Sequence, residues 1–403
     1  MKNVVVIGGG ASGIMAALTA AEDRDNRVLL IERQQRIGRK LLATGNGRCN
    51  LTNIGAAGEN YHGESPDFVL PALKKFPPTA TLEFFRSLGL ITVTEESGRV
   101  YPLSNSANSV LDVLRFALER RGVEILTACP VREIKREKKG FNLVTDDKTI
   151  HGDRLIAACG GAAGSKLGGV MDGYKLLAPL GHKRTALHPA LVQLVTEPEY
   201  PRALKGVRAD GRIWLTAGGR TLAESAGELQ FTDKGVSGIA AFDISRAAAL
   251  CGEGGKVHMD LLRAYGAAEI QAMLRRRREA LPELPAEELF TGMLHNRLGR
   301  MIVKYAGIDR AAAIGALPDK ALDAAAACCK DFALSLRGTE GFDAAQVTAG
   351  GVMTGDFDPN TLESRLVPGL FVCGELLDVD GDCGGYNLQW AWSSGRLAGR
   401  LGR

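Results

Sequence analysis

The sequence lacks the patterns that mark membrane, secreted or metal-binding proteins. No apolar stretch approaches the roughly 18 residues that a membrane-spanning helix needs. The apolar run at residues 4–7 ends in three glycines, and no signal-peptide cleavage site follows it. None of the eight cysteines forms a C-x-x-C pair, which argues against a zinc site or a thioredoxin-like motif. We therefore expect a cytoplasmic protein with reduced thiols and with neither a membrane nor a metal as its partner.

The sequence also lacks a large excess of charge of either sign. The 50 lysines and arginines exceed the 46 acidic residues by only four, so the formal net charge is +4. The run Arg275–Arg278 is the only dense basic cluster, and Glu269 and Glu279 flank it. A solvated helix face explains this run better than contact with nucleic acid or a membrane does. We accordingly expect a small molecule, and not a nucleic acid, as the partner.

Glycine, by contrast, is abundant. It supplies 50 of 403 residues, about 12%, where roughly 7% is average. An excess of this size indicates tight turns and places where backbone comes close to another group. The hydrophobic share of 45% and the charged share of 24% are ordinary for a globular protein. The chain is longer than one hydrophobic core usually serves, so two or three domains are expected.

The first glycine cluster lies between a strand and a helix. A β-branched strand over 4–7 leads into Gly8, Gly10 and Gly13 in G-x-G-x-x-G spacing, and good helix formers fill 14–21. This spacing allows a sharp turn, a close approach of pyrophosphate to the backbone, and close packing of helix on strand. A second strand over 27–31 ends at Glu32, where a carboxylate binds adenosine ribose hydroxyls. The sequence therefore predicts a dinucleotide site that includes Ala11 and Ser12.

The segment over 33–53 has cationic side chains, glycines and asparagines but no apolar period. We interpret it as a binding loop and not as a helix face. Its cations suit a pyrophosphate and its Gly45–Gly47 backbone suits a flavin ring, while a solvated basic loop is the alternative. The predicted cofactor contacts are Arg33, Arg39, Lys40, Leu41, Gly45, Asn46, Gly47, Arg48, Cys49 and Asn50.

A second strand–glycine loop–helix unit lies near the end of the sequence. A strand over 369–373 ends at Gly374 and Glu375, and a helix follows over 390–401. Such a unit supplies an acid to the ribityl chain of a flavin and a helix N-terminus to its pyrimidine edge. The predicted contacts in this unit are Gly374, Glu375, Gly385, Tyr386, Asn387 and Leu388. The aspartates between them do not form a calcium loop, because no glutamate stands at the twelfth position.

A third cluster follows the apolar strand at 155–158. It contributes Cys159, Gly160 and Gly161, whose backbone we expect close to the cofactor. Strands are also expected over 122–126 and 141–144. Val131 follows the first of these strands, and in dinucleotide-binding folds the backbone at this place lies near the adenine of the cofactor.

These motifs together resemble the HI-type conserved flavoproteins of bacteria, a grouping of NAD(P)/FAD-dependent oxidoreductases. The resemblance rests on 8–13, 38–53, 227–238, 348–352 and 374–395, which extend over nearly the whole chain. It implies an α/β fold whose Rossmann-like FAD-binding domain comprises 1–190 and 341–403. It also implies an inserted β-barrel over 191–260 and 331–340, and a small helical domain over 261–330.

The same resemblance implies an FAD-dependent oxidoreductase that acts on a small, hydrophobic organic substrate, with NAD(P)H as a transient electron donor. The grouping includes 3-dehydro-bile-acid Δ(4,6)-reductases, which points to reduction of a conjugated C=C bond, and aminoacetone-oxidase-like members, which point to an oxygen-using amine oxidase. An RNA-modification or RNA-binding flavoprotein and a redox sensor are alternatives of another class. The oligomeric state is left open.

Catalytic residues are less clearly indicated. Cys49 has no neighbouring cysteine, which excludes a disulfide reductase and leaves a charge-transfer thiol or a small apolar side chain. Reduction of an enone needs hydride from the flavin and an acid for the adjacent carbon. Arg48 and Tyr386, with Tyr101, are the polar residues expected near the flavin, and His188 is a further residue that could face the substrate.

Overall fold

Five parallel strands form the central sheet, in the order β20–β11–β1–β2–β7. Their bounds are β1 (Lys2–Ile7), β2 (Asn26–Ile31), β7 (Glu124–Leu126), β11 (Arg154–Ala157) and β20 (Leu370–Val372). All of them except the edge strand β7 consist largely of buried apolar residues, as strands covered on both faces require. The apolar runs expected from the sequence are thus neighbours in one parallel sheet, and the predicted Rossmann-like α/β fold is confirmed.

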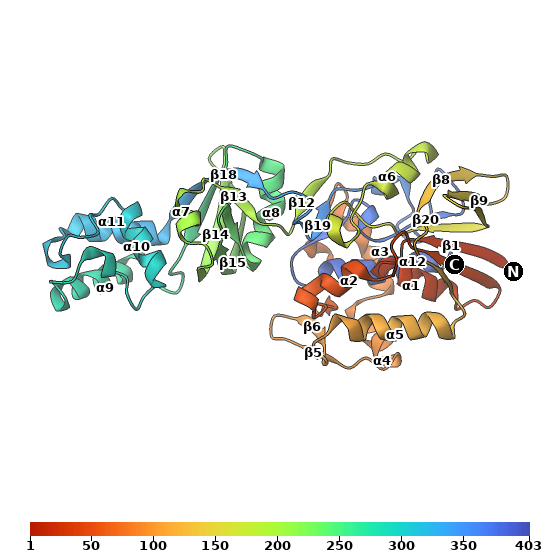
Figure 1. Cartoon of the computed structure of the whole chain (residues 1–403), viewed down its shortest axis with the longest axis horizontal. Coiled ribbons are helices and arrows are strands. Elements are labelled where there is room, and N and C mark those ends of the chain that lie inside the picture. The colour runs from red at the N-terminus through yellow and green to blue at the C-terminus, as the bar shows by residue number, and fades with distance from the viewer. The chain divides into compact units, whose positions relative to one another are not determined.

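The structure, a computed structural model, describes residues 1–403 and divides them into two compact units (Figure 1). The first, which we call the sheet unit, comprises 1–188 and 346–403; the second, the barrel unit, comprises 189–345. The sequence places a separate helical domain over 261–330. In the structure these helices share one hydrophobic core with the barrel strands, because apolar side chains of both pack together.

Besides the central sheet, the sheet unit contains seven α-helices and several small sheets. Its helices are α1 (Ala11–Ala20), α2 (Arg39–Ala43), α3 (Leu70–Lys75), α4 (Pro78–Ser87), α5 (Ala107–Arg120), α6 (Asp172–Leu177) and α12 (Tyr386–Gly399). Its further strands are β3 (Thr52–Asn53), β4 (Tyr61–His62), β5 (Thr92–Thr94), β6 (Arg99–Pro102), β8 (Val131–Arg136), β9 (Phe141–Thr145), β10 (Thr149–Gly152) and β21 (Asp380–Gly381). The chain passes from one unit to the other at β12 (His188–Ala190) and returns at β19 (Val347–Ala349).

A closed antiparallel barrel with the strand order β13–β16–β15–β14–β17–β18 forms the barrel unit. The strands are β13 (Leu194–Thr196), β14 (Arg208–Ala217), β15 (Arg220–Phe231), β16 (Gly235–Ser237), β17 (Lys256–Asp260) and β18 (Phe332–Thr339). In β14 the buried residues Gly211, Ile213 and Leu215 alternate with more exposed ones, as a strand with one buried face requires. The helices are α7 (Glu199–Ala203), α8 (Ile239–Cys251), α9 (Ala267–Ala280), α10 (Asn296–Tyr305) and α11 (Asp319–Lys330).

Helices α1 and α12, separated by more than 360 residues of chain, pack closely in the sheet unit. A Cβ on Gly395 would stand 3.1 Å from the Cβ of Met15, and one on Gly399 would stand 2.5 Å from the carbonyl oxygen of Ala16. Glycine destabilises a helix interior by about 1 kcal/mol relative to alanine. Its use at both positions is explained by the short distance between the two helix backbones.

One segment is more ordered than the sequence indicates. The sequence predicts an irregular loop over 33–53, but residues 39–43 form the short helix α2. This helix is capped by Gly38 in a left-handed conformation, and its Leu41 is buried in the core. A single apolar anchor on five residues gives no detectable sequence period, which is why the pattern did not reveal it.

No helix of the structure is long and apolar enough to cross a membrane.

The close contact of α1 with α12 leads to a stability prediction. Gly395→Ala adds a methyl group where Met15 and the backbone of Ser12 leave no room, so we expect about 1–3 kcal/mol of destabilisation. The measurement is the melting temperature of the sheet unit in differential scanning calorimetry. Gly355→Ala is the matched control, because no atom lies within 4 Å of its added methyl group and its φ is not positive. Equal melting temperatures for the two variants would contradict the packing argument.

Candidate functional site

The G-x-G-x-x-G loop joins β1 to α1, and its three glycines have different surroundings. Gly8 has φ +109°, and a Cβ there would stand 2.7 Å from the carbonyl carbon of Ala158. A Cβ on Gly13 would stand 3.0 Å from the carbonyl carbon of Gly8. Around Gly10 no atom lies within 4 Å of such a Cβ. The outer two glycines thus close the turn, while the middle one leaves its backbone open at the N-terminus of α1.

This open backbone is the geometry that a pyrophosphate needs. The first turn of α1, which contains Ala11 and Ser12, carries N–H groups that no preceding helical turn can satisfy. Such a helix N-terminus attracts anions through these groups and through its dipole. The residues present therefore fit a dinucleotide phosphate at Gly10.

Glu32 follows β2 and lies against the glycine loop. Its carboxylate accepts hydrogen bonds from the amides of Gly9 (2.8 Å) and Gln34 (2.7 Å). The amide of Cys129 donates to the Glu32 carbonyl at 3.0 Å, and this brings the chain leading to Val131 beside the same loop. Val131 itself is buried at the start of β8. Glu32 is fixed by two amides, and its carboxylate retains lone pairs that a ribose hydroxyl can use.

The basic side chains of 33–40 bind to the protein itself. Arg33 donates to the carbonyl of Gly168 at 3.2 Å, and Arg39 donates to Gln34 at 2.5 Å and to the carbonyl of Lys166 at 2.9 Å. Both arginines thus hold the loop that follows the third glycine cluster. Their role at a pyrophosphate stays a prediction, since most of these contacts are to backbone carbonyls.

Glu375 brings two distant segments together. Its carboxylate pairs with Lys40 Nζ at 2.6 Å and accepts the amide of Thr348 at 2.8 Å. A Cβ on Gly161 would stand 2.9 Å from the same carboxylate. Gly160 has φ +74°, and a Cβ added to it would have no atom within 4 Å. Gly374, before Glu375, has φ +73°. The third glycine cluster and Glu375 therefore line one region, with Lys40 balancing the carboxylate charge.

The turn after α2 adopts an uncommon backbone conformation. Gly45, Asn46 and Gly47 have φ of 56°, 55° and 84°, and Cys49 has φ 62°. Left-handed residues other than glycine are strained, and such strain gathers at binding sites. The Asn50 side-chain oxygen that follows is buried without a hydrogen-bond partner.

Cys49 and Cys159 both carry buried thiols. Burial raises the pKa of the Cys49 thiol to about 12, although the Thr44 hydroxyl acts in the opposite direction. Burial also raises the pKa of the Cys159 thiol to about 12, with the Glu32 charge adding to the effect. Neither forms an appreciable thiolate near neutral pH. This supports the apolar interpretation of Cys49 over the charge-transfer one.

Helix α12 begins beside this turn. Its N-cap is Gly385, with φ +101°, and a Cβ there would stand 2.9 Å from Asn50 Oδ1. The side chain of Asn387 exchanges two hydrogen bonds with the backbone of Gly381, at 2.8 and 2.7 Å. Leu388 is half-buried and packs against the core. The predicted helix N-terminus is thus held beside the Gly45–Asn50 turn.

The polar side chains considered for catalysis lie around the same turn. The Arg48 guanidinium stacks 4.0 Å above the Tyr101 ring, donates to Asn105 at 2.5 Å and pairs with Glu95 at 3.1 Å. The Tyr386 ring packs edge-on against Tyr61, with centroids 6.4 Å apart. Burial is the main cause that raises the pKa of Tyr101, so its phenol stays protonated at neutral pH. His188, by contrast, is half-buried in β12, at the last residue of the sheet unit before the barrel unit begins.

Sequence reasoning missed three groups at this site. Thr348 holds Glu375, and its hydroxyl accepts the amide of Ala163 at 2.9 Å. His62 Nε2 lies 2.6 Å from Asp382 Oδ1, because β4 pairs with β21. Tyr174 carries a buried hydroxyl without a partner. Thr348 belongs to the stretch 348–352 that carries the family resemblance, but no local pattern indicates its contact with Glu375. His62 and Tyr174 have no local sequence signal, since the groups around them come from other segments of the chain.

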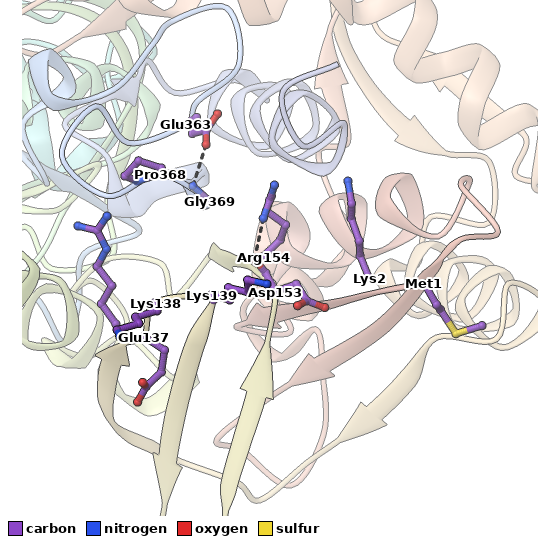
Figure 2. A pocket seen from close by; sticks show the side chains of 12 residues that line it. Met1, Lys2, Glu137, Lys138, Lys139, Asp153, Arg154, Glu363, Pro368 and Gly369 are labelled. Carbon is purple, nitrogen blue, oxygen red and sulfur yellow. Dashed lines mark hydrogen bonds between the residues drawn. The ribbon is translucent and has the colours of Figure 1, made fainter.

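A separate basic pocket of about 470 Å³ lies at the amino ends of the parallel strands, opposite the glycine loops (Figure 2). It is lined by Lys2 and Arg154, at the first residues of β1 and β11, and by Arg136, Lys138 and Lys139. The glycine loops follow the last residues of these strands, so this pocket is not part of the site described above. Backbone amides engage two of its carboxylates, with 2.7 Å bonds from Gly369 to Glu363 and from Asn3 to Asp153, and the Asn142 side chain engages the third, Glu137.

Comparison with known proteins agrees with this geometry. A family model described as the HI0933-like protein Rossmann domain matches residues 2–401. A 3-dehydro-bile acid Δ(4,6)-reductase of Clostridium scindens is 43% identical, over 99% of this chain and 98% of that protein. A ribosomal RNA dihydrouridine synthase of Escherichia coli is 30% identical, over 97% and 96%.

A solved structure shares the fold. The 3-ketosteroid Δ1-dehydrogenase of Sterolibacterium denitrificans, in complex with 1,4-androstadiene-3,17-dione, aligns over 99% of both chains. The TM-score is 0.52 and the sequence identity 13%, so this likeness concerns the fold alone. With the family match over nearly the whole chain, the expected resemblance to HI-type flavoprotein oxidoreductases is confirmed: the protein belongs to the HI0933-like family.

Proposed function

We propose that this oxidoreductase binds FAD and reduces a C=C bond conjugated to a carbonyl group in a small hydrophobic substrate, a steroid enone of the bile-acid type. The observation that carries the proposal is the 43% identity to a bile acid Δ(4,6)-reductase over nearly the whole of both chains. The open backbone at Gly10 and the fixed carboxylates of Glu32 and Glu375 support the cofactor.

Each part of the site has a distinct role toward the cofactor. Gly10 and the first turn of α1 bind the pyrophosphate, Glu32 binds a ribose, and Glu375 with Lys40 binds the ribityl region. Bound FAD supplies the hydride. The N-terminus of α12 stabilises negative charge on the cofactor through its free amides and its dipole.

Hydride addition to an enone also needs a proton donor and a group that stabilises the enolate oxygen. We assign Tyr386 and Arg48 to this side of the site, because Arg48 belongs to the Gly45–Asn50 turn and Tyr386 follows Gly385, which packs against Asn50. A guanidinium such as that of Arg48 is suited to the oxygen, while a phenol such as that of Tyr386 is suited to the proton. NAD(P)H is the proposed electron donor, and it binds transiently because the dinucleotide loop is used by FAD.

Reduction of uracil within RNA is the second candidate function. It is favoured by the 30% identity to a ribosomal RNA dihydrouridine synthase. The C=C bond of uracil is also conjugated to a carbonyl, so the chemistry would be the same. The basic run of α9 gives this candidate little support, because Arg275 pairs with Asp323 at 2.6 Å and Arg278 pairs with Asp319 at 2.8 Å. The steroid enone is therefore the preferred substrate class.

The cysteines support a location in a reducing compartment. None of the eight forms a disulfide in the structure. We accordingly propose that the protein works in the cytoplasm.

A substrate experiment tests the proposal. The purified protein, loaded with FAD and reduced anaerobically, is mixed with a 3-oxo-4-ene or 3-oxo-4,6-diene steroid, and flavin reoxidation is followed by absorbance. We expect reoxidation with both steroids and none with the saturated 3-oxo steroid, which lacks the double bond. A uracil-containing RNA serves as the second arm. Reoxidation by the RNA and by neither enone would replace the steroid proposal with the RNA one.

A glycine variant tests the cofactor assignment separately. Gly10→Val places a side chain in open space, so we expect the melting temperature of the apoprotein to change little. The same side chain blocks the approach of a pyrophosphate, and we expect FAD affinity to fall by at least about tenfold, or roughly 1.4 kcal/mol. FAD fluorescence titration measures the affinity. Gly13→Ala is the contrasting variant, which should lower the melting temperature because its Cβ meets Gly8. Unchanged FAD affinity in Gly10→Val would refute the pyrophosphate site.

The buried thiol gives a prediction on pH. With a pKa of about 12, Cys49 stays protonated from about pH 6 to 9. The Cys49→Ala variant should therefore keep the pH dependence of flavin reduction, and wild-type protein should show no long-wavelength thiolate-to-flavin band in this range. Absorbance spectra of both proteins across the same pH range decide the matter. A band that grows with pH and disappears in Cys49→Ala would restore the charge-transfer role.

A further inference from the structure

The hydroxyl of Tyr174 is buried without a hydrogen-bond partner. Tyr174 lies in α6, is 5% exposed, and its oxygen is among the few buried side-chain atoms that bond to nothing. The buried Tyr61 and the partly buried Tyr305 differ in this respect. Tyr61 donates to the carbonyl of Tyr386 and Tyr305 donates to that of Ala333, both at 3.0 Å. An unpaired buried hydroxyl destabilises a fold, so its retention calls for a reason.

The helix that carries Tyr174 packs on two segments of the candidate cofactor site. A Cβ on the adjacent Gly173 would stand 2.7 Å from the Cβ of Cys159 and 2.8 Å from Leu376 Cδ1. α6 therefore packs directly on the third glycine cluster and on the turn that carries Glu375. Burial, followed by the charge of Glu375, raises the pKa of Tyr174, and Arg184 opposes this effect. Tyr174 thus stays a neutral hydrogen-bond donor at any working pH.

The groups around Tyr174 are already bonded to others. The two oxygens of Glu375 accept from Thr348 and Lys40. The Cys159 thiol points to the carbonyl of Ile7 at 3.8 Å. The Tyr174 hydroxyl therefore has no partner within the protein, while its helix packs on the turn that carries Glu375, the carboxylate assigned to the ribityl region.

We propose that Tyr174 is a cofactor-positioning residue whose hydroxyl donates a hydrogen bond to an oxygen of bound FAD next to Glu375. The inference rests on the proposed FAD binding and names a residue of that site which no sequence motif marks. In the apoprotein the hydroxyl is destabilising, and in the holoprotein it is paired. The same group therefore lowers the stability of one state and raises the affinity for the cofactor.

The opposite signs of these two effects allow a sharp test with Tyr174→Phe. FAD is stripped from the holoenzyme, and the apoprotein melting temperature and FAD fluorescence titration are measured. We expect a melting temperature equal to or above that of wild type, and FAD affinity weakened about three- to tenfold, the loss of one hydrogen bond. Tyr305→Phe is the matched control. It removes a paired hydroxyl in the barrel unit, so it should lower the melting temperature and leave FAD affinity unchanged.

The other outcomes are equally decisive. If Tyr174→Phe binds FAD as tightly as wild type, or if its apoprotein is less stable or fails to fold, the inference is wrong, because the hydroxyl then has its partner within the protein. If wild-type protein itself binds no FAD, the proposed function fails together with the inference. Tight FAD binding by wild type with no effect of Tyr174→Phe overturns the role of Tyr174 alone.

Discussion

The close approach of α1 to α12 is the constraint on which the site depends. Gly395 and Gly399 let the backbones meet, and the buried Trp390 and Ser394 bond to the two backbone groups of Gly374. These contacts fix α12 against the strand end that carries Glu375. The two helix N-termini, at Gly10 and at Gly385, are thereby held in one rigid unit, so a change in helix packing would move both ends of the cofactor site together.

Some polar groups in the site are held in place by bonds within the protein, and others have no partner there. Glu32, Glu375 and Asn387 are fixed by backbone amides and charged partners. Asn50 and Tyr174 have buried oxygens with no partner. The bonded groups give the site its shape before any ligand binds, and the unbonded ones are available to a ligand. This arrangement is typical of a pre-formed cofactor site.

Local patterns predicted the parts of the site that depend on backbone conformation. Gly8, Gly10 and Gly13 lie between a strand and a helix, and this spacing in that context predicts the turn that the structure shows. Its role at a dinucleotide stays a prediction. The ion pair of Lys40 with Glu375 and the pairing of His62 with Asp382 join residues more than 300 positions apart. No local rule predicts these, because strand order and helix packing bring the partners together. Helix α2 was missed for the opposite reason, since its five residues are too few to show a period.

The insertion of the barrel unit between the two parts of the sheet unit affects the order in which the units can fold during synthesis. α1 is synthesised near the start, and its partner α12 appears only after the whole of residues 189–345. During translation the apolar face of α1 is therefore uncovered until Gly395 and Gly399 of α12 have been made. The barrel unit by then has all of its strands and its own core. Domains generally fold as units as they emerge. This chain order lets the barrel unit fold before α12 is available to complete the sheet unit.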